Sequence, residues 1–363
     1  MDNFFKKTDR VLLVIIGVIL FMAFLALYSA SYEPGDASVK DYSTQQLMWI
    51  GLTLVAAVLC VRFGYERWID FGYIIFAINL LMLVFVFILG DTRYGARRWI
   101  GLGVFSLQPS EFCKISFLLA LTKYVSDNNE NITGPKTIFG AMLLCMLPVG
   151  LIMKQPDLGT ALTFLPIFFT VLLVAGARIK HLMVILFSAV ACSPVLWGML
   201  KLYQKKRLLV FMNPNIDPLG AGYTIIQSRI AVGSGGLFGK GWLAGTQNQL
   251  NFLPERHTDF IFSVIGEEWG FTGAFILLSL FLFLINRLLF TADAVGDIRG
   301  KILLSGIAVL IWFQVFVNIG MTIGLMPVVG LPLPFISYGG SNLLTTMIMI
   351  GLAISINMKR KIF

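Results

Sequence analysis

Long apolar stretches separated by short polar segments run along the whole chain. Ten of them are long and apolar enough to cross the hydrocarbon core of a bilayer, which takes about 20 apolar residues per helix. We therefore predict an all-α polytopic membrane protein with ten transmembrane helices, at residues 11–30, 46–62, 71–90, 110–125, 138–153, 158–175, 181–200, 260–286, 302–325 and 341–357. The first stretch is too long for the apolar region of a signal peptide, so we expect a retained anchor.

The polar segment at 201–259 is much longer than the others, and its sequence is not that of a disordered linker. Within it, AGYTIIQSRIAVG has the apolar content of a short interfacial helix. The next stretch is rich in glycine, which permits tight turns and close approach of the backbone to a ligand. No long polar linker divides the chain, so we predict a single domain over residues 1–363 with one large structured extracytoplasmic loop at 201–259.

Composition agrees with a membrane protein: 57% of residues are hydrophobic, 13% are charged and the mean hydropathy is +0.84. Ten crossings would put both termini on one side, whose loops and ends carry 15 lysines and arginines. The other side carries 13, but 11 of these lie in the two longer segments 91–114 and 201–259. Since the positive-inside rule applies to short loops, both termini are predicted to be cytoplasmic. The basic residues of the two outer segments then favour an anionic ligand outside.

A dense group of polar residues precedes the apolar run at 260–286. It contains Glu255, Arg256, His257 and Asp259. Asp259 has the position of a helix N-cap, but a carboxylate at a membrane mouth is equally suited to act on a substrate. We expect Arg256 and His257 to keep it ionised by proximity. Deeper in the same run, Glu267 and Glu268 point in different directions, so one of them should bond another helix.

Other polar residues stand at the outer ends of predicted spans. Arg98 and Trp99 belong to a small basic and aromatic cluster, and Glu111 and Lys114 have the i,i+3 spacing of a helical ion pair. That pair either orients two helices or forms the floor of a cavity with Lys114 near a phosphate. Asp157 is either a helix cap or a binding residue.

The segment at 326–342 is rich in proline and glycine. Irregular backbone at membrane depth is tolerated only where protein or a water-filled cavity satisfies it. We therefore predict that this segment closes the outer cavity.

The chain has only two histidines, which excludes a histidine-rich metal site. Carboxylates with phosphate oxygens suit Mg²⁺ or Mn²⁺, although no sequence motif identifies such a site. No organic cofactor is predicted. Gly239 to Ala244 fit the pattern G-x-G-x-x-A but follow no strand, so a dinucleotide site is excluded.

Five strings, in this order, resemble the SEDS family (shape, elongation, division and sporulation), closer to its elongation branch than to its division branch. They are GARRWIGLGVFSLQPSEFCKI, QPDLGTAL, DPLGAGYTIIQSRIAVGSGGLFGKGW, GTQNQLNFLPERHTDFIFSVIGEE and GLPLPFISYGGSN. The resemblance covers essentially the whole chain. It implies a peptidoglycan glycosyltransferase in the bacterial cytoplasmic membrane that polymerises lipid II at the outer face.

The resemblance also implies the site and the partners. The family's essential aspartate falls on Asp259, and its Trp, Glu and Lys positions fall on Trp99, Glu111 and Lys114. A class B penicillin-binding protein, a transpeptidase, is the expected partner alongside other elongation-complex proteins, and no nucleic acid is expected.

These residues suggest a mechanism with one base and several cations. Asp259 would be the general base, and Arg98, Lys114, Lys240 or Arg256 would neutralise the pyrophosphate. Substrate contacts are further expected from Asp157 and His257. The main alternative is a lipid II flippase, which would need polar features reaching both faces, whereas here the complex loops all lie outside. A non-catalytic scaffold would not need the polar group around Asp259.

Overall fold

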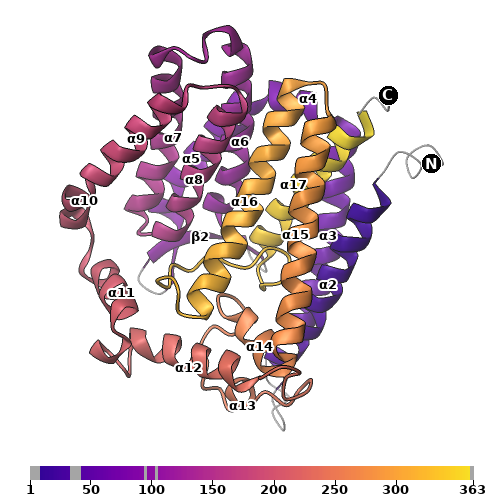
Figure 1. Cartoon of the computed structure of the whole chain (residues 1–363), viewed down its shortest axis with the longest axis vertical. Coiled ribbons are helices and arrows are strands. Elements are labelled where there is room, and N and C mark those ends of the chain that lie inside the picture. Colours follow the sequence, from indigo (N-terminus) through magenta and orange to yellow (C-terminus); the bar gives the residue numbers. More distant parts are fainter. Residues whose placement is uncertain (1–8, 33–41, 94–95, 103–104, 360–363) are drawn as a thin grey trace.

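The computed structural model describes residues 9–32, 42–93, 96–102 and 105–359, and helices dominate it (Figure 1). Its elements, in chain order, are α2 (Arg10–Ser31), α3 (Tyr42–Phe63), α4 (Tyr65–Asp70), α5 (Gly72–Leu89), β1 (Asp91–Arg93), β2 (Ala96–Leu102), β3 (Phe105–Leu107), α6 (Pro109–Asp127), η1 (Asn129–Asn131), α7 (Pro135–Lys154), α8 (Leu158–Val174), α9 (Ile179–Ala191), α10 (Ser193–Met199), α11 (Leu202–Met212), η2 (Pro214–Ile216), α12 (Ala221–Ser234), α13 (Thr246–Gln249), α14 (Ile261–Glu268), α15 (Gly270–Ala294), α16 (Ile298–Thr322) and α17 (Gly340–Lys359).

The predicted all-α membrane class is confirmed. In the described part of the chain, six helices are long and apolar enough to span a membrane, namely α2, α3, α7, α15, α16 and α17. Shorter apolar helices cover 72–88, 158–174 and 179–195. Helix α6, which carries the remaining predicted span, is long enough at 19 residues, but charged side chains interrupt its apolar stretch. The ten predicted spans thus all fall on helices, while ten crossings stay a prediction.

Helices α16 and α17 form the centre of the bundle. Most residues of their apolar windows are buried, whereas less than half are buried in the other four long apolar helices. Helix α16 packs against α8 and α15, and α17 packs against α3. In Figure 1 the start of α2, the end of α17 and helix α4 lie on one side of the bundle. Helices α12, α13 and α14 lie on the opposite side. The two central helices therefore connect these two sides.

A small antiparallel sheet follows α5, which the sequence analysis did not predict. Its strand order is β1-β2-β3, with Asp91 opposite Trp99 and Ile100 opposite Leu107. The sheet places two basic residues of β2, Arg97 and Arg98, at fixed positions beside the helix ends. Three such short strands carry too little alternation to be recognised in a sequence.

The run at 260–286, predicted as one helix, is broken at Trp269 and Gly270 into α14 and α15. Backbone groups of the glycine-rich segment satisfy the break. The amides of Lys240 and Gly241 donate to the carbonyls of Glu267 and Glu268, each at 3.0 Å. In return the amides of Phe271 and Thr272 donate to carbonyls at 236 and 237, at 2.9 and 3.0 Å. Periodicity alone could not reveal this break, because the residues that stabilise it lie 30 positions earlier.

Gly270 is the conformational centre of the break. Its φ is +65°, and a Cβ there would lie 2.3 Å from the amide nitrogen of Gly239. We predict that Gly270→Ala lowers the free energy of unfolding by about 2 kcal/mol or more, because an L side chain is strained at positive φ. The apparent Tm in detergent should fall by roughly 3 °C or more. Gly296→Ala is the matched control, since a Cβ at Gly296 would meet nothing within 4 Å. Equal Tm values for the two variants would contradict this account.

Candidate active site

Asp259 lies in the turn that leads into α14, and the backbone of this turn is fastened at three successive carbonyls. The carbonyl of His257 accepts from the amide of Tyr338 at 2.9 Å, and that of Thr258 accepts from the hydroxyl of Ser337 at 2.6 Å. The carbonyl of Asp259 accepts from the side-chain amide of Asn318 at 3.0 Å. The turn is therefore held from α16 and from the segment between α16 and α17, not by its own helix.

The segment at 326–342 passes directly beside the carboxylate. Asn318 also donates to the carbonyl of Leu331 at 2.8 Å, so one buried amide ties this segment and the Asp259 turn together. A Cβ on Gly330 would lie 3.4 Å from Oδ2 of Asp259, and the φ of Gly330 is +72°. Glycine at this position lets the backbone come close to the carboxylate. Val328 of this segment lines the cavity at Asp259, while closure of that cavity on the outer side stays a prediction.

A cavity of about 190 Å³ lies at Asp259. Its walls come from α11, α12, the turn before α14 and the segment after α16, with Arg207, Val210, Thr224, Ile225, Pro254, Glu255, Asp259, Phe260 and Val328 as lining residues. Asp259 is half-buried. Phe260, not Asp259, occupies the N-cap of α14. Among the described residues no hydrogen bond or ion pair to the Asp259 carboxylate is found, so its oxygens remain available to a ligand.

The pKa of Asp259 is raised to about 6. Burial is the largest cause, because it disfavours the charged carboxylate, and the negative charge of Glu255 adds to it. Arg207 and Arg98 act in the opposite direction, and Asp157 raises the pKa further. The expectation that Arg256 and His257 hold Asp259 ionised is wrong: the cations that act on it come from α11 and β2.

Arg98 and Asp157 form a second group that acts on Asp259. Arg98 of β2 donates to the carbonyl of Gln155 at 3.1 Å and to that of Pro156. A guanidinium nitrogen of Arg98 lies 3.7 Å from Oδ2 of Asp157. Asp157 caps α8, accepting from the amide of Thr160 at 3.1 Å. The capping role that the sequence suggested is thus observed, and the carboxylate is close enough to influence Asp259 electrostatically.

Glu111 and Lys114 make the ion pair that their spacing predicts. The ammonium of Lys114 lies 2.8 Å from Oε2 of Glu111, and both side chains are at most 3% exposed. A pair this deeply buried leaves an uncompensated charge if either partner is removed. Both residues lie on α6, and Lys114 is not among the residues that line the Asp259 cavity. Trp99 is half-buried in β2, opposite Asp91.

The remaining predicted residues are engaged elsewhere. Lys240 pairs with Glu267 at 2.7 Å and donates to Thr246. Arg256 is buried and donates to the carbonyls of Ala30 and Asn248, each at 2.8 Å.

The ring of His257 stacks on that of Tyr42, with centroids 4.1 Å apart. Glu268 accepts from Ser29 of α2, so one of the two deep glutamates does bond another helix. None of Lys240, Arg256 and His257 lines the Asp259 cavity, and their contacts secure the turn and the glycine-rich segment.

Two lining residues had no role in the sequence analysis. Arg207 is the last of four basic residues in KLYQKKR, a pattern typical of a solvated helix, and only the fold brings it opposite Asp259. Glu255 stood in the polar group before α14 without an assigned function. Its φ of +53° is unusual for a residue other than glycine. This unusual conformation lies four residues from Asp259, but sequence periodicity cannot reveal it.

The described residues contain no group of three or more histidine, cysteine, aspartate or glutamate side chains that could hold a metal ion. Two carboxylates, Asp259 and Glu255, do line the same cavity. Such a pair does not make a resident metal cage, but it fits Mg²⁺, which is commonly bound by one or two carboxylates together with substrate phosphates.

Comparisons with known proteins place the chain in a family. Residues 9–362 match the family described as cell cycle protein, which comprises FtsW, RodA and SpoVE. The peptidoglycan glycosyltransferase MrdB of Escherichia coli K12 is 40% identical over 371 residues, covering 99% of this chain and 98% of that protein.

Two solved structures are similar over nearly the whole chain. One is a chain from a structure described as the structural coordination of polymerization and crosslinking by a peptidoglycan synthase complex. It matches with a TM-score of 0.84 and 35% identity, and the match covers 97% of this chain and 98% of that chain. The other is the rod-shape-determining protein RodA of Thermus thermophilus, with a TM-score of 0.72, 32% identity and 98% coverage of both chains. The family match over residues 9–362 and these full-length similarities establish that the chain belongs to the FtsW, RodA and SpoVE family, also called SEDS.

Proposed function

We propose that this chain is a peptidoglycan glycosyltransferase of cell elongation that joins lipid II units into β-1,4 glycan strands. Lipid II is a disaccharide-pentapeptide carried on undecaprenyl pyrophosphate. The observation that carries the proposal is a carboxylate without a protein partner among the described residues, in a cavity that an arginine also lines. The names of the similar proteins point to the same reaction.

Asp259 is the general base in this proposal. It takes the proton from the acceptor 4-hydroxyl while that oxygen attacks the anomeric carbon of the donor. The bond between that carbon and the pyrophosphate oxygen breaks, its electron pair leaves with the lipid pyrophosphate, and the configuration inverts. A glycosidase needs a second carboxyl group to protonate its leaving oxygen. Pyrophosphate needs only charge neutralisation, so one base with cations is sufficient.

Arg207 is the cation best placed for this neutralisation, because it lines the cavity together with Asp259. Arginine suits the task, since its planar guanidinium can bind phosphate oxygens in a bidentate manner. Arg98 acts from farther away, being held by backbone carbonyls near Asp157. Mg²⁺ or Mn²⁺ entering with the pyrophosphate would be held by Asp259 and Glu255, and would supply further neutralisation of phosphate charge.

The raised pKa of Asp259 supports its role. A carboxylate with a pKa of about 6 is mostly ionised at neutral pH, yet it is a stronger base than an ordinary aspartate. The enclosed cavity thus supplies both the position and the basicity that the reaction requires.

We further propose that the protein lies in the bacterial cytoplasmic membrane with both termini in the cytoplasm, so that the Asp259 end faces outside. The basic residues of the short loops support this orientation. The similar structure from a synthase complex supports a class B penicillin-binding protein as partner, which would crosslink the strands made here.

Asp259→Asn should abolish polymerisation of fluorescent lipid II by the purified protein with its transpeptidase partner, lowering the rate by at least about 10²-fold because a general base contributes this much. Asp293→Asn, which changes an exposed carboxylate at the other end of the molecule, should leave the rate unchanged. Size-exclusion profiles check that both variants fold and bind the partner. Lipid II flipping in vesicles without any glycan product would instead favour a flippase.

The pH dependence should report the ionisation of Asp259. Because only the ionised form accepts a proton, the rate should fall as the pH drops through about 6. Glu255→Gln removes a negative charge that raises this pKa, so the acidic limb should move to lower pH. Arg207→Gln removes a charge that lowers it, so the limb should move to higher pH. The test is to measure the rate between pH values of about 4 and 8 for the unaltered protein and for the two variants. An acidic limb that stays in place in both variants would refute the assignment of the base.

A further inference from the structure

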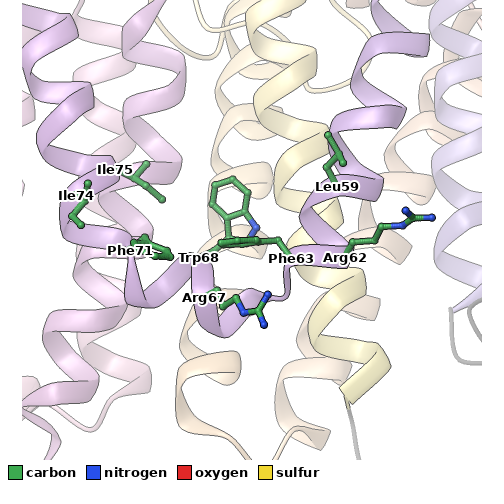
Figure 2. Close-up of a pocket in the computed structure, with 8 residues that line it drawn as sticks. All are labelled: Leu59, Arg62, Phe63, Arg67, Trp68, Phe71, Ile74 and Ile75. Carbon is green, nitrogen blue, oxygen red and sulfur yellow. The ribbon is translucent and has the colours of Figure 1, made fainter.

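A larger cavity lies at the opposite end of the molecule, beside α4 (Figure 2). Its volume is about 660 Å³, within the range of about 300–1,000 Å³ that is typical of small-molecule sites. It is lined by the end of α3, by α4 and by the start of α5, with Leu59, Arg62, Phe63, Arg67, Trp68, Phe71, Ile74 and Ile75. Neither the reaction at Asp259 nor the predicted site residues involve this cavity.

The chain path explains why the space exists. Helix α3 packs chiefly on α17, and α5 packs chiefly on α6, so their neighbouring ends are not drawn together. Gly64, with a φ of +86°, turns the chain sharply between α3 and α4. Helix α4 then crosses from one helix to the other, as Figure 2 shows. The cavity is the space that α4 closes at the end of the bundle.

Contacts on one face of α4 hold it in place. Glu66 pairs with Lys359 of α17, and the hydroxyl of Tyr65 donates to Asp297 at 2.9 Å. On the other face, Arg67 and Trp68 line the cavity. Figure 2 shows Trp68 projecting between Ile75 of α5 and Leu59 of α3, with Arg67 at the level of α4. Tyr65 and Glu66 thus anchor α4, and the side chains of Arg67 and Trp68 take no part in these contacts.

The apolar lining is open to the surroundings of the bundle. Leu59, Ile74 and Phe71 are 60%, 57% and 47% exposed. For a membrane-spanning bundle these side chains face lipid acyl chains.

The two arginines of the cavity make no ion pair with the part of the chain that the structure describes. Among the described residues, neither Arg62 nor Arg67 has a carboxylate within 4 Å, although nearby Arg299 and Lys359 are both paired. The guanidinium of Arg67 lies over the ring of Phe63, 5.6 Å from its centroid. The indole nitrogen of Trp68 is buried without an acceptor, so it does not face the open space of the cavity. The two exposed guanidinium groups of Arg62 and Arg67 are therefore the groups available to an anionic acceptor.

We infer that this cavity binds an anionic phospholipid of the cytoplasmic leaflet. Its phosphate would accept from Arg62 and Arg67, and its acyl chains would cover the apolar walls. Basic pockets between transmembrane helices on the cytoplasmic side are suited to such headgroups. A transmembrane helix of a partner would cover the walls but leave two guanidinium groups without an anion. The inference rests on the proposed orientation, which makes this end cytoplasmic.

The inferred phospholipid site can be tested by native mass spectrometry of the full-length protein released from nanodiscs. The discs contain phosphatidylcholine with a minor fraction of phosphatidylglycerol, and retained phosphatidylglycerol is counted. Arg62→Gln with Arg67→Gln should lower its apparent affinity by about 25-fold, at about fivefold per arginine. Trp68→Phe, which keeps an aromatic ring and removes only a buried donor, should retain phosphatidylglycerol like the unaltered protein.

Arg178→Gln with Lys180→Gln is the matched control, because it removes the same charge from exposed positions that the proposed orientation puts on the same membrane face. This control should retain phosphatidylglycerol like the unaltered protein. Equal loss in both double variants would mean general surface attraction and would overturn the inference, as would retention that no variant changes. Displacement of the phospholipid by the transpeptidase would assign the cavity to a partner helix and also overturn it.

The lipid measurement is independent of catalysis. Asp259→Asn should retain phosphatidylglycerol fully, since Asp259 lies in the other cavity. If lipid II polymerisation failed while retention behaved as expected, the proposed reaction would be wrong and the lipid site would stand. Thermal unfolding of each variant verifies that the exposed arginine changes leave the fold intact.

Discussion

The buried amide of Asn318 is the contact on which the geometry of the site depends. It joins the carbonyl of Asp259 to the carbonyl of Leu331, and so connects the turn before α14 with the segment that enters α17. Ser337 and Tyr338 add two more bonds to the same turn. With its backbone fixed in this way, Asp259 does not need its own side chain for capping. The carboxylate therefore remains available to a ligand, and Val328 of the segment beside it lines the same cavity.

The irregular backbone at this end of the bundle is satisfied from within. The break between α14 and α15 receives amides and carbonyls from the glycine-rich segment, which removes the free-energy cost of unpaired backbone groups at the edge of a membrane. Side chains that looked like substrate ligands complete this structure. Lys240 holds Glu267 and Arg256 holds the carbonyls of Ala30 and Asn248, so much of the local charge serves to build the site.

Two cavities of different chemistry then lie at opposite ends of one bundle. Near Asp259, two carboxylates and an arginine line a small enclosed space, which suits proton transfer beside a phosphate. Beside α4, apolar walls with two arginines that pair with no carboxylate among the described residues line a larger and more open space, which suits a lipid. The buried helices α16 and α17 run between these ends. A lipid bound beside α4 would thus contact α3, whose main packing partner is α17.

The amino-acid sequence by itself determined the membrane class, the helical positions and the place of the polar group around Asp259 at the start of a helix, because hydropathy and spacing are local properties. It also determined the Glu111–Lys114 pair and the capping by Asp157, whose partners lie three residues away. Only the tertiary structure decided that Arg207 and Glu255 share the cavity of Asp259, that Lys240 contacts Glu267 while Arg256 contacts the carbonyls of Ala30 and Asn248, and that α14 and α15 are separate. Each of these depends on contacts between segments far apart in the chain, and hydrophobic periodicity carries no information about which distant segments meet.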